Sequence, residues 1–167
     1  MNNTPASTAG LLDSVMEITR AAGRVILDVY GTDFAVRGKG DASPVTEADE
    51  RAEALIVPAL RALTPDVPVV AEEEVAAGRM PAVKDRFWLV DPLDGTKEFI
   101  SRNGEFTVNI ALVENGVPVL GVVYAPALDR LFAGADGLGA FVEDAGQRRA
   151  IRCRTVPEAG LTVVASR

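Results

Sequence analysis

The run WLVDPLDGTKEF at residues 88–99 constrains the fold of this chain more than any other segment. Its apolar start predicts a buried strand, which ends in two carboxylates, Asp91 and Asp94. Gly95 and Thr96 follow, and this pair can open a helix. Carboxylates at a strand end attract hard divalent cations, and backbone N–H groups at a helix start attract phosphate. The run therefore favours metal-assisted phosphate chemistry over a simple turn.

The absence of histidine limits the chemistry that the chain can perform. It excludes a Ser-His-Asp triad, histidine acid–base catalysis and histidine-bound zinc. Catalysis must then rely on carboxylates, hydroxyls, Lys, Arg or a metal ion. Cys153 is the only cysteine, so no intrachain disulfide can form. The absence of an intrachain disulfide suits a reducing cytoplasm. We expect the thiol to be buried in a strand.

Length and charge predict one packed domain that does not bind nucleic acid. The 167 residues are 48% hydrophobic, and the net charge of −7 repels a nucleic-acid backbone. We expect residues 1–10 to be disordered and residues 11–167 to form the domain. No integral membrane segment or secretory signal is recognisable. A cytoplasmic location is expected, with peripheral association with the inner membrane as an alternative.

Two helices are predicted in the first part of the chain. Apolar residues at helical spacing place the first helix at about residues 10–30. The second helix has its apolar face within residues 48–63, and it begins with a capping signature in which Thr46 precedes Asp49 by three residues. Pro58 lies inside this helix, and we expect it to kink the helix about one turn earlier.

Short apolar runs predict strands in the remainder of the chain. The runs at residues 67–71 and 87–90 each end in acidic residues, and Asn115-Gly116 is a hairpin signal. The resulting fold class is α+β, with two N-terminal helices packed on a mostly antiparallel sheet. Further strands are expected at residues 106–114, 117–125, 130–135, 140–143, 150–154 and 162–165.

Acidic residues follow several of the apolar runs and form the candidate site. If the two short strands are neighbours, Glu72 and Asp91 lie side by side at one end of the sheet. Packed carboxylates are unfavourable unless a proton or a cation lies between them. All-oxygen ligands favour Mg²⁺ or Mn²⁺. Taken singly, each feature has a simpler reading: a turn, a solvated acidic loop, or a charge at a helix start.

Three segments carry a resemblance to a known family. Residues 88–96 (WLVDPLDGT), 70–73 (VAEE) and 43–49 (SPVTEAD) resemble the inositol monophosphatase superfamily of metal-dependent, lithium-sensitive phosphatases. Within it, residues 97–100 (KEFI) and 103–112 (NGEFTVNIAL) are most similar to the CysQ-type 3′(2′),5′-bisphosphate nucleotidases. The resemblance implies the N-terminal domain of that fold.

The resemblance also implies which residues hold metal ions. Glu72, Asp91 and the carbonyl of Leu93 would hold a first Mg²⁺. Asp91 and Asp94 would hold a second Mg²⁺. The resemblance implies two or three Mg²⁺ ions in the active site in all. Glu73 would support this centre from behind.

Further roles follow from the same resemblance. The implied catalytic residues are Asp49, Thr96 and Glu72, of which Asp49 and Thr96 would orient and activate the attacking water. Lys39 and Asp41 would lie on a loop that closes over the metals. The implied contacts with substrate are Glu72, Leu93, Asp94, Gly95 and Thr96.

The implied activity is hydrolysis of the 3′-phosphate of 3′-phosphoadenosine 5′-phosphate or its sulfated form, in sulfate assimilation. Alternative substrates are inositol monophosphate, histidinol phosphate and sugar phosphates, and only residues 97–109 discriminate among them. A different class of function, a non-catalytic metal-binding or interaction fragment, also remains open, as does assembly with further copies of the chain.

Family members carry a second, C-terminal α/β domain that this sequence does not contain. That domain completes the second metal site and forms much of the substrate wall. We therefore expect one incomplete metal site and weak or absent activity of the isolated chain.

Overall fold

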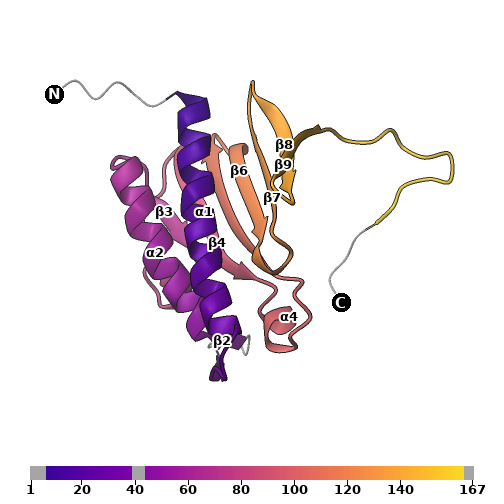
Figure 1. The fold of residues 1–167 in the computed structure, drawn as a ribbon. Coiled ribbons are helices and arrows are strands. Elements are labelled where there is room, and N and C mark those ends of the chain that lie inside the picture. The colour runs from indigo at the N-terminus through magenta and orange to yellow at the C-terminus, as the bar shows by residue number, and fades with distance from the viewer. Residues whose placement is uncertain (1–6, 39–43, 164–167) are drawn as a thin grey trace.

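Two helices packed on one face of a twisted sheet form the body of the molecule (Figure 1). The computed structural model describes residues 7–38 and 44–163. Helices α1 (Thr8–Tyr30) and α2 (Glu47–Leu63) lie side by side, with α1 against β6 and α2 against β4. The predicted α+β class, with two N-terminal helices on a mostly antiparallel sheet, is confirmed.

The sheet has seven strands in the order β3-β4-β5-β6-β7-β8-β9. Only the β3–β4 pair is parallel, and the remaining neighbours in this sheet are antiparallel. This arrangement follows from the connections, since hairpins join the later strands whereas a longer crossover separates β3 from β4. The strands are β3 (Val69–Ala71), β4 (Arg86–Asp94), β5 (Thr107–Glu114), β6 (Val117–Ala125), β7 (Arg130–Ala135), β8 (Gly139–Asp144) and β9 (Gln147–Ile151).

Helix α1 begins two residues earlier than the periodicity predicts, because Ser7 accepts a hydrogen bond from the N–H of Gly10. The first six residues of the expected disordered segment lie outside the described residues. Gly23 is buried in this helix, and a Cβ atom there would lie 2.5 Å from the Tyr124 ring on β6. A glycine at this position therefore lets α1 approach the sheet closely.

Helix α2 confirms the predicted capping signature. The Thr46 side chain and the Asp49 carboxylate form a complete capping box. The helix runs through Pro58 without a break. Pro58 and Ala54 are both exposed, so solvent can bond the Ala54 carbonyl that proline leaves without its usual donor. The expected kink stays a prediction.

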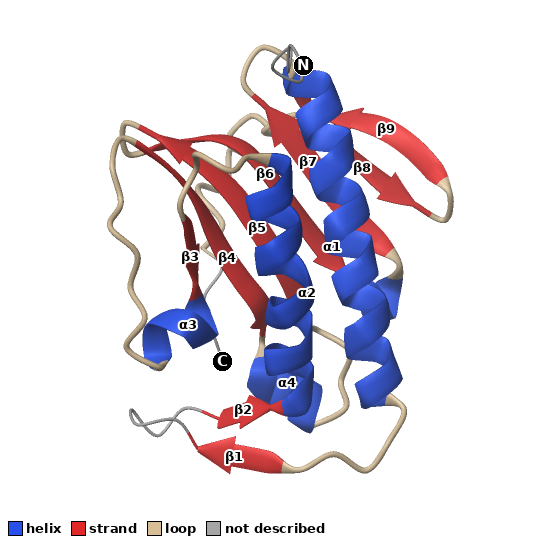
Figure 2. Ribbon diagram, turned by 90° about the vertical axis from the view of Figure 1, so that its left-hand side faces the viewer, coloured by secondary structure: helices blue, strands red, loops and turns tan. Residues whose placement is uncertain are grey.

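Several small elements border the helices and the sheet. Strands β1 (Val36–Gly38) and β2 (Pro44–Thr46) form a separate antiparallel pair. Residues 72–76 form the short helix α3 (Glu72–Ala76), where the acidic composition alone suggests a loop. In Figure 2, β1 and β2 lie below α1 and α2, and α3 lies to the left of α2. Helix α4 (Thr96–Ile100) follows β4 as predicted, and the 3₁₀ turn η1 (Pro126–Leu128) links β6 to β7.

The C-terminal part departs from the sequence expectations. Thr162 and Val163 are not in a strand, and the other residues of the expected 162–165 strand lie outside the described residues. Strand β9 ends at Ile151, so Cys153 lies beyond it and is exposed rather than buried. Residues 152–163 are exposed and run away from the sheet (Figure 1), so the apolar residues of this segment do not mark a strand.

Candidate active site

The candidate site lies where β3 and β4 end and where α2, α3 and α4 begin (Figure 2). These element ends carry the acidic residues that the sequence singles out. Of the expected site residues, Lys39 and Asp41 lie outside the described residues.

Glu72 and Asp91 meet at the ends of the parallel strand pair. Ala71 of β3 stands opposite Val90 of β4, so Glu72 and Asp91 are the next residues along neighbouring strands. Burial, followed by the charge and side-chain hydrogen bond of Glu72 and by the charge of Asp94, raises the pKa of Asp91 to about 7. Two carboxylates in hydrogen-bond contact must share a proton or a cation. The predicted juxtaposition of these two residues is thus present in the fold.

A bulge in β4 places Asp94 beside the same cluster. Asp91 pairs with Asn109 and Asp94 with Thr107 across the β4–β5 ladder, with a register shift between the two pairs. The Nδ2 group of Asn109 donates to Oδ2 of Asp94 at 3.2 Å, and the Thr107 hydroxyl donates to Oδ1 of Asn109 at 3.0 Å. Asn109 therefore holds one carboxylate oxygen of Asp94, a role that the sequence analysis missed.

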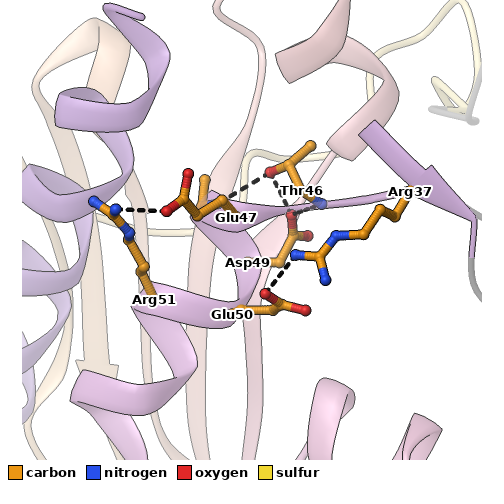
Figure 3. A network of polar contacts seen from close by, with 7 residues as sticks. Arg37, Thr46, Glu47, Asp49, Glu50 and Arg51 are labelled. Atoms are coloured by element: carbon orange, nitrogen blue, oxygen red, sulfur yellow. Dashed lines mark hydrogen bonds and ion pairs between the residues drawn. The ribbon is translucent and has the colours of Figure 1, made fainter. Parts of the chain in front are cut away.

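Asp49 is 1% exposed and uses both of its carboxylate oxygens. Oδ2 accepts from the backbone N–H of Thr46 at 2.8 Å and from the Thr46 hydroxyl at 2.7 Å (Figure 3). Oδ1 faces the hydroxyl of Thr96 at 3.3 Å. The capping box thus fixes the carboxylate that meets Thr96, and the predicted pairing of Asp49 with Thr96 is present.

The turn between β4 and α4 brings the Thr96 side chain to this position. Gly95 is the N-cap of α4 with φ 90°, and a Cβ atom there would lie 3.0 Å from the carbonyl oxygen of Glu105. Both facts favour glycine. The Thr96 hydroxyl also lies 3.3 Å from the Leu93 carbonyl oxygen. Because a hydroxyl carries one proton, Asp49 and Leu93 compete for it.

The donor set fits a hard divalent cation in kind. Carboxylates of Glu72, Asp91 and Asp94 and the carbonyl of Leu93 are oxygen ligands of the type that Mg²⁺ prefers. A cation bound between Glu72 and Asp91 would replace the proton that these two carboxylates otherwise share. In the described ranges, no three Asp, Glu or Cys side chains converge to hold an ion by themselves. Backbone, water or phosphate oxygens would have to complete the coordination.

Glu53 is a second residue that the sequence analysis missed. It belongs to α2, is 6% exposed, and its Oε2 accepts the backbone N–H of Glu73 at 2.7 Å. Desolvation by burial raises its pKa, while the backbone hydrogen bonds from Glu73 and Glu74 lower it. Glu53 lies on the helix beside apolar positions, but no local pattern indicates a contact with a segment twenty residues away.

Two hollows border these elements. A recess of about 380 Å³ is lined by Val70, Val75 and Leu89, with Glu72 and Asp91 among its lining residues. A larger hollow of about 710 Å³ lies between α2 and α3 and is lined partly by Glu53 and Glu73. The smaller recess is the one next to the candidate metal ligands.

Comparison with known proteins places the chain in a family. Residues 10–166 match the inositol monophosphatase family, and the chain belongs to it. The chain is 51% identical over 146 residues to the 3′(2′),5′-bisphosphate nucleotidase CysQ of Escherichia coli (strain K12), covering 86% of this chain and 59% of that protein. It is 43% identical over 125 residues to the protein of the same name from Buchnera aphidicola, covering 74% of this chain and 47% of that one.

Solved structures agree with this assignment. The CysQ structure from Bacteroides thetaiotaomicron, described as a bacterial member of the inositol monophosphatase family, has a TM-score of 0.65 and 40% identity. The matched region covers 81% of this chain and 49% of the Bacteroides thetaiotaomicron chain. The IMPase structure from Thermotoga maritima has a TM-score of 0.74 and 35% identity, covering 89% and 54%. The chain thus spans about half the length of the relatives that it matches.

The described residues contain no helix that combines the length and hydropathy required to cross a membrane.

Proposed function

We propose that this chain is the metal-binding portion of a magnesium-dependent phosphatase. The observation that carries the proposal is the contact between Glu72 and Asp91, which places two carboxylates just beyond the point where the parallel pairing of β3 with β4 ends. Such a pair is stable when a proton or a cation bridges it. The phosphatase chemistry comes from membership of the inositol monophosphatase family.

Within this proposal, Glu72, Asp91 and the Leu93 carbonyl hold a first Mg²⁺, and Asp91 and Asp94 hold a second. Mn²⁺ can replace Mg²⁺, and a third ion can bind. Glu73 supports the residues that bind the metal ions. Bound divalent cations supply activation of water and neutralisation of the phosphate charge.

The protein's own acid–base group is Asp49 with Thr96. The Thr96 hydroxyl can donate its proton to Oδ1 of Asp49, 3.3 Å away, while its lone pairs accept a proton from a water. The Thr46 bonds keep the carboxylate in place during this exchange. Backbone N–H groups of Gly95 and Thr96 then orient the phosphate.

The proposed substrate is 3′-phosphoadenosine 5′-phosphate, cleaved at its 3′-phosphate. The support is the 51% identity to a protein named 3′(2′),5′-bisphosphate nucleotidase CysQ. A role in sulfate assimilation and a cytoplasmic location are parts of the same proposal. The competing substrates are inositol monophosphate, histidinol phosphate and sugar phosphates, since relatives named IMPase share the fold.

The remaining expectations concern what the isolated chain can do. The chain spans 59% of the Escherichia coli relative, so weak or absent turnover is expected of it alone. A non-catalytic metal-binding fragment and self-association remain the alternatives.

The test measures phosphate release from this panel of substrates in the presence of Mg²⁺. Preference for the adenosine bisphosphate, abolished in Asp91→Asn, supports the proposal. Turnover of inositol monophosphate in preference to the adenosine bisphosphate would overturn the substrate assignment. Turnover unaffected by Asp91→Asn would overturn the assigned site.

A further inference from the structure

Glu53 is a buried carboxylate with no role in the proposed chemistry. It is 6% exposed in the second turn of α2 and lies within the larger hollow between α2 and α3. Burying a carboxylate is costly unless hydrogen bonds compensate. The neighbouring side chains of Glu73 and Glu74 repel it in addition. A neutral residue would be the cheaper choice for stability alone.

The compensation comes from the first turn of α3. Oε2 of Glu53 accepts the backbone N–H of Glu73 at 2.7 Å, and the N–H of Glu74 also bonds to this carboxylate. The N-cap residue of α3 is Ala71, which has no side-chain acceptor. The first-turn N–H groups of a helix need acceptors from elsewhere. Glu53 thus caps α3 from a neighbouring helix.

This cap bears directly on Glu72, the first residue of α3. On one side of Glu72, the pairing of Ala71 with Val90 fixes the backbone. On the other side, the bonds to Glu53 fix it. Arg61 of α2 also pairs with Glu74 at 2.9 Å. A helix of five residues is not stable alone, so the direction of Glu72 depends on its attachments to β4 and α2.

We propose that Glu53 is a positioning residue for the metal centre, whose buried carboxylate holds the first turn of α3 so that Glu72 faces Asp91. This inference rests on the proposed function. Glu53 contacts no substrate in it, and acts only through the backbone of residues 73 and 74.

The test compares two substitutions with a charge-matched control. Glu53→Leu removes the acceptor and retains much of the side-chain volume, whereas Glu53→Gln restores one acceptor oxygen. Glu47→Gln removes the same charge from an exposed position of α2, where Glu47 pairs with Arg51. Calorimetric titration with Mg²⁺ and hydrogen exchange at the amides of residues 73 and 74 are the measurements.

Mg²⁺ affinity should fall about 10- to 100-fold in Glu53→Leu, with an intermediate loss in Glu53→Gln. The two amides should exchange faster in Glu53→Leu even without metal. The control should retain the affinity of the unsubstituted chain. Melting temperatures are measured in parallel, to show whether the loss of Mg²⁺ affinity in the two Glu53 variants follows a general loss of stability.

Equal Mg²⁺ affinities in the unsubstituted chain and both Glu53 variants would overturn the inference while leaving the metal centre intact. Unchanged exchange at residues 73 and 74 would also overturn it. If the unsubstituted chain does not bind Mg²⁺, the proposed metal centre itself fails and this inference fails with it.

Discussion

The hydroxyl of Thr96 lies 3.3 Å from Oδ1 of Asp49, across 47 residues of sequence. It joins the start of α4 to the start of α2. Since Asp49 is buried and its other oxygen is bound by Thr46, the geometry of this contact, which we propose as the acid–base pair of the site, is fixed.

Replacing Thr96 by valine removes the hydroxyl and keeps the shape of the side chain. Whatever turnover the unsubstituted chain shows should fall roughly 100-fold or more, which is the usual contribution of a positioned acid–base group. Mg²⁺ affinity should change little. The matched control is Ser101→Ala, which removes an exposed hydroxyl at the other end of α4. Phosphate release that is equal in Thr96→Val and in the control would contradict the assignment.

The stability of the metal-free chain should depend on pH through Asp91. Its pKa rises from 3.8 to about 7 on folding, so the folded state binds this proton more tightly than the unfolded chain. The stabilisation is complete below the unfolded pKa and is lost as pH rises through about 7. The melting temperature should therefore fall across this window.

Asp91→Asn supplies the control for the pH dependence, because an amide cannot titrate. The difference in melting temperature between Asp91→Asn and the unsubstituted chain should grow as pH increases from about 4 to about 7 without metal, and should level off above that range. Saturating Mg²⁺ should reduce the pH dependence of the unsubstituted chain, since a cation replaces the proton. Parallel pH profiles of the two metal-free chains would rule out a proton shared with Glu72.

Asn109→Asp would place a carboxylate against Asp94. Like charges on neighbouring strands repel, so the metal-free variant should lose roughly 1 kcal/mol of stability at neutral pH. Mg²⁺ should restore part of this loss, because the cation screens the two carboxylates. Asn109→Ala loses the bond to Asp94 without adding charge and serves as the control. Equal responses of the two variants to Mg²⁺ in thermal unfolding would show that Asp94 lies outside the ion's influence.

Gly23→Ala tests the close packing of α1 on β6. The added Cβ would lie 2.5 Å from the ring of Tyr124, so either the ring or the helix must move. We expect a loss of about 1–3 kcal/mol in the free energy of unfolding. Gly31→Ala is the matched control, because its φ of −75° suits alanine and the added Cβ would lie 3.7 Å from the carbonyl oxygen of Leu27. A Gly23→Ala chain as stable as the control would argue against this contact.

Local patterns predict the elements whose causes are local. The capping box of Thr46 and Asp49 depends on residues three apart, and the Asn115-Gly116 turn depends on two residues with positive φ. Apolar runs followed by acid identify β3 and β4. The parallel pairing of β3 with β4, which brings Glu72 to Asp91, cannot be read from the sequence alone and is seen only in the structure.

Long-range contacts account for what the sequence does not reveal. Glu53 is a polar residue beside the apolar face of a helix, and its partner Glu73 is twenty residues away. The five-residue helix α3 depends on that contact more than on its own composition. The role of Asn109 depends on the register of β4 and β5 around a bulge. Neither contact leaves a periodic signal in the sequence.

Calorimetric titration with Mg²⁺, with Mn²⁺ as a second probe, tests the central claim most directly. It compares the unsubstituted chain, Asp91→Asn, and the control Asp85→Asn, which alters an exposed carboxylate just before β4. The account predicts binding to the unsubstituted chain and to the control, and its loss in Asp91→Asn. Absence of binding to all three chains, or equal binding to all three, would contradict a metal centre at Glu72 and Asp91.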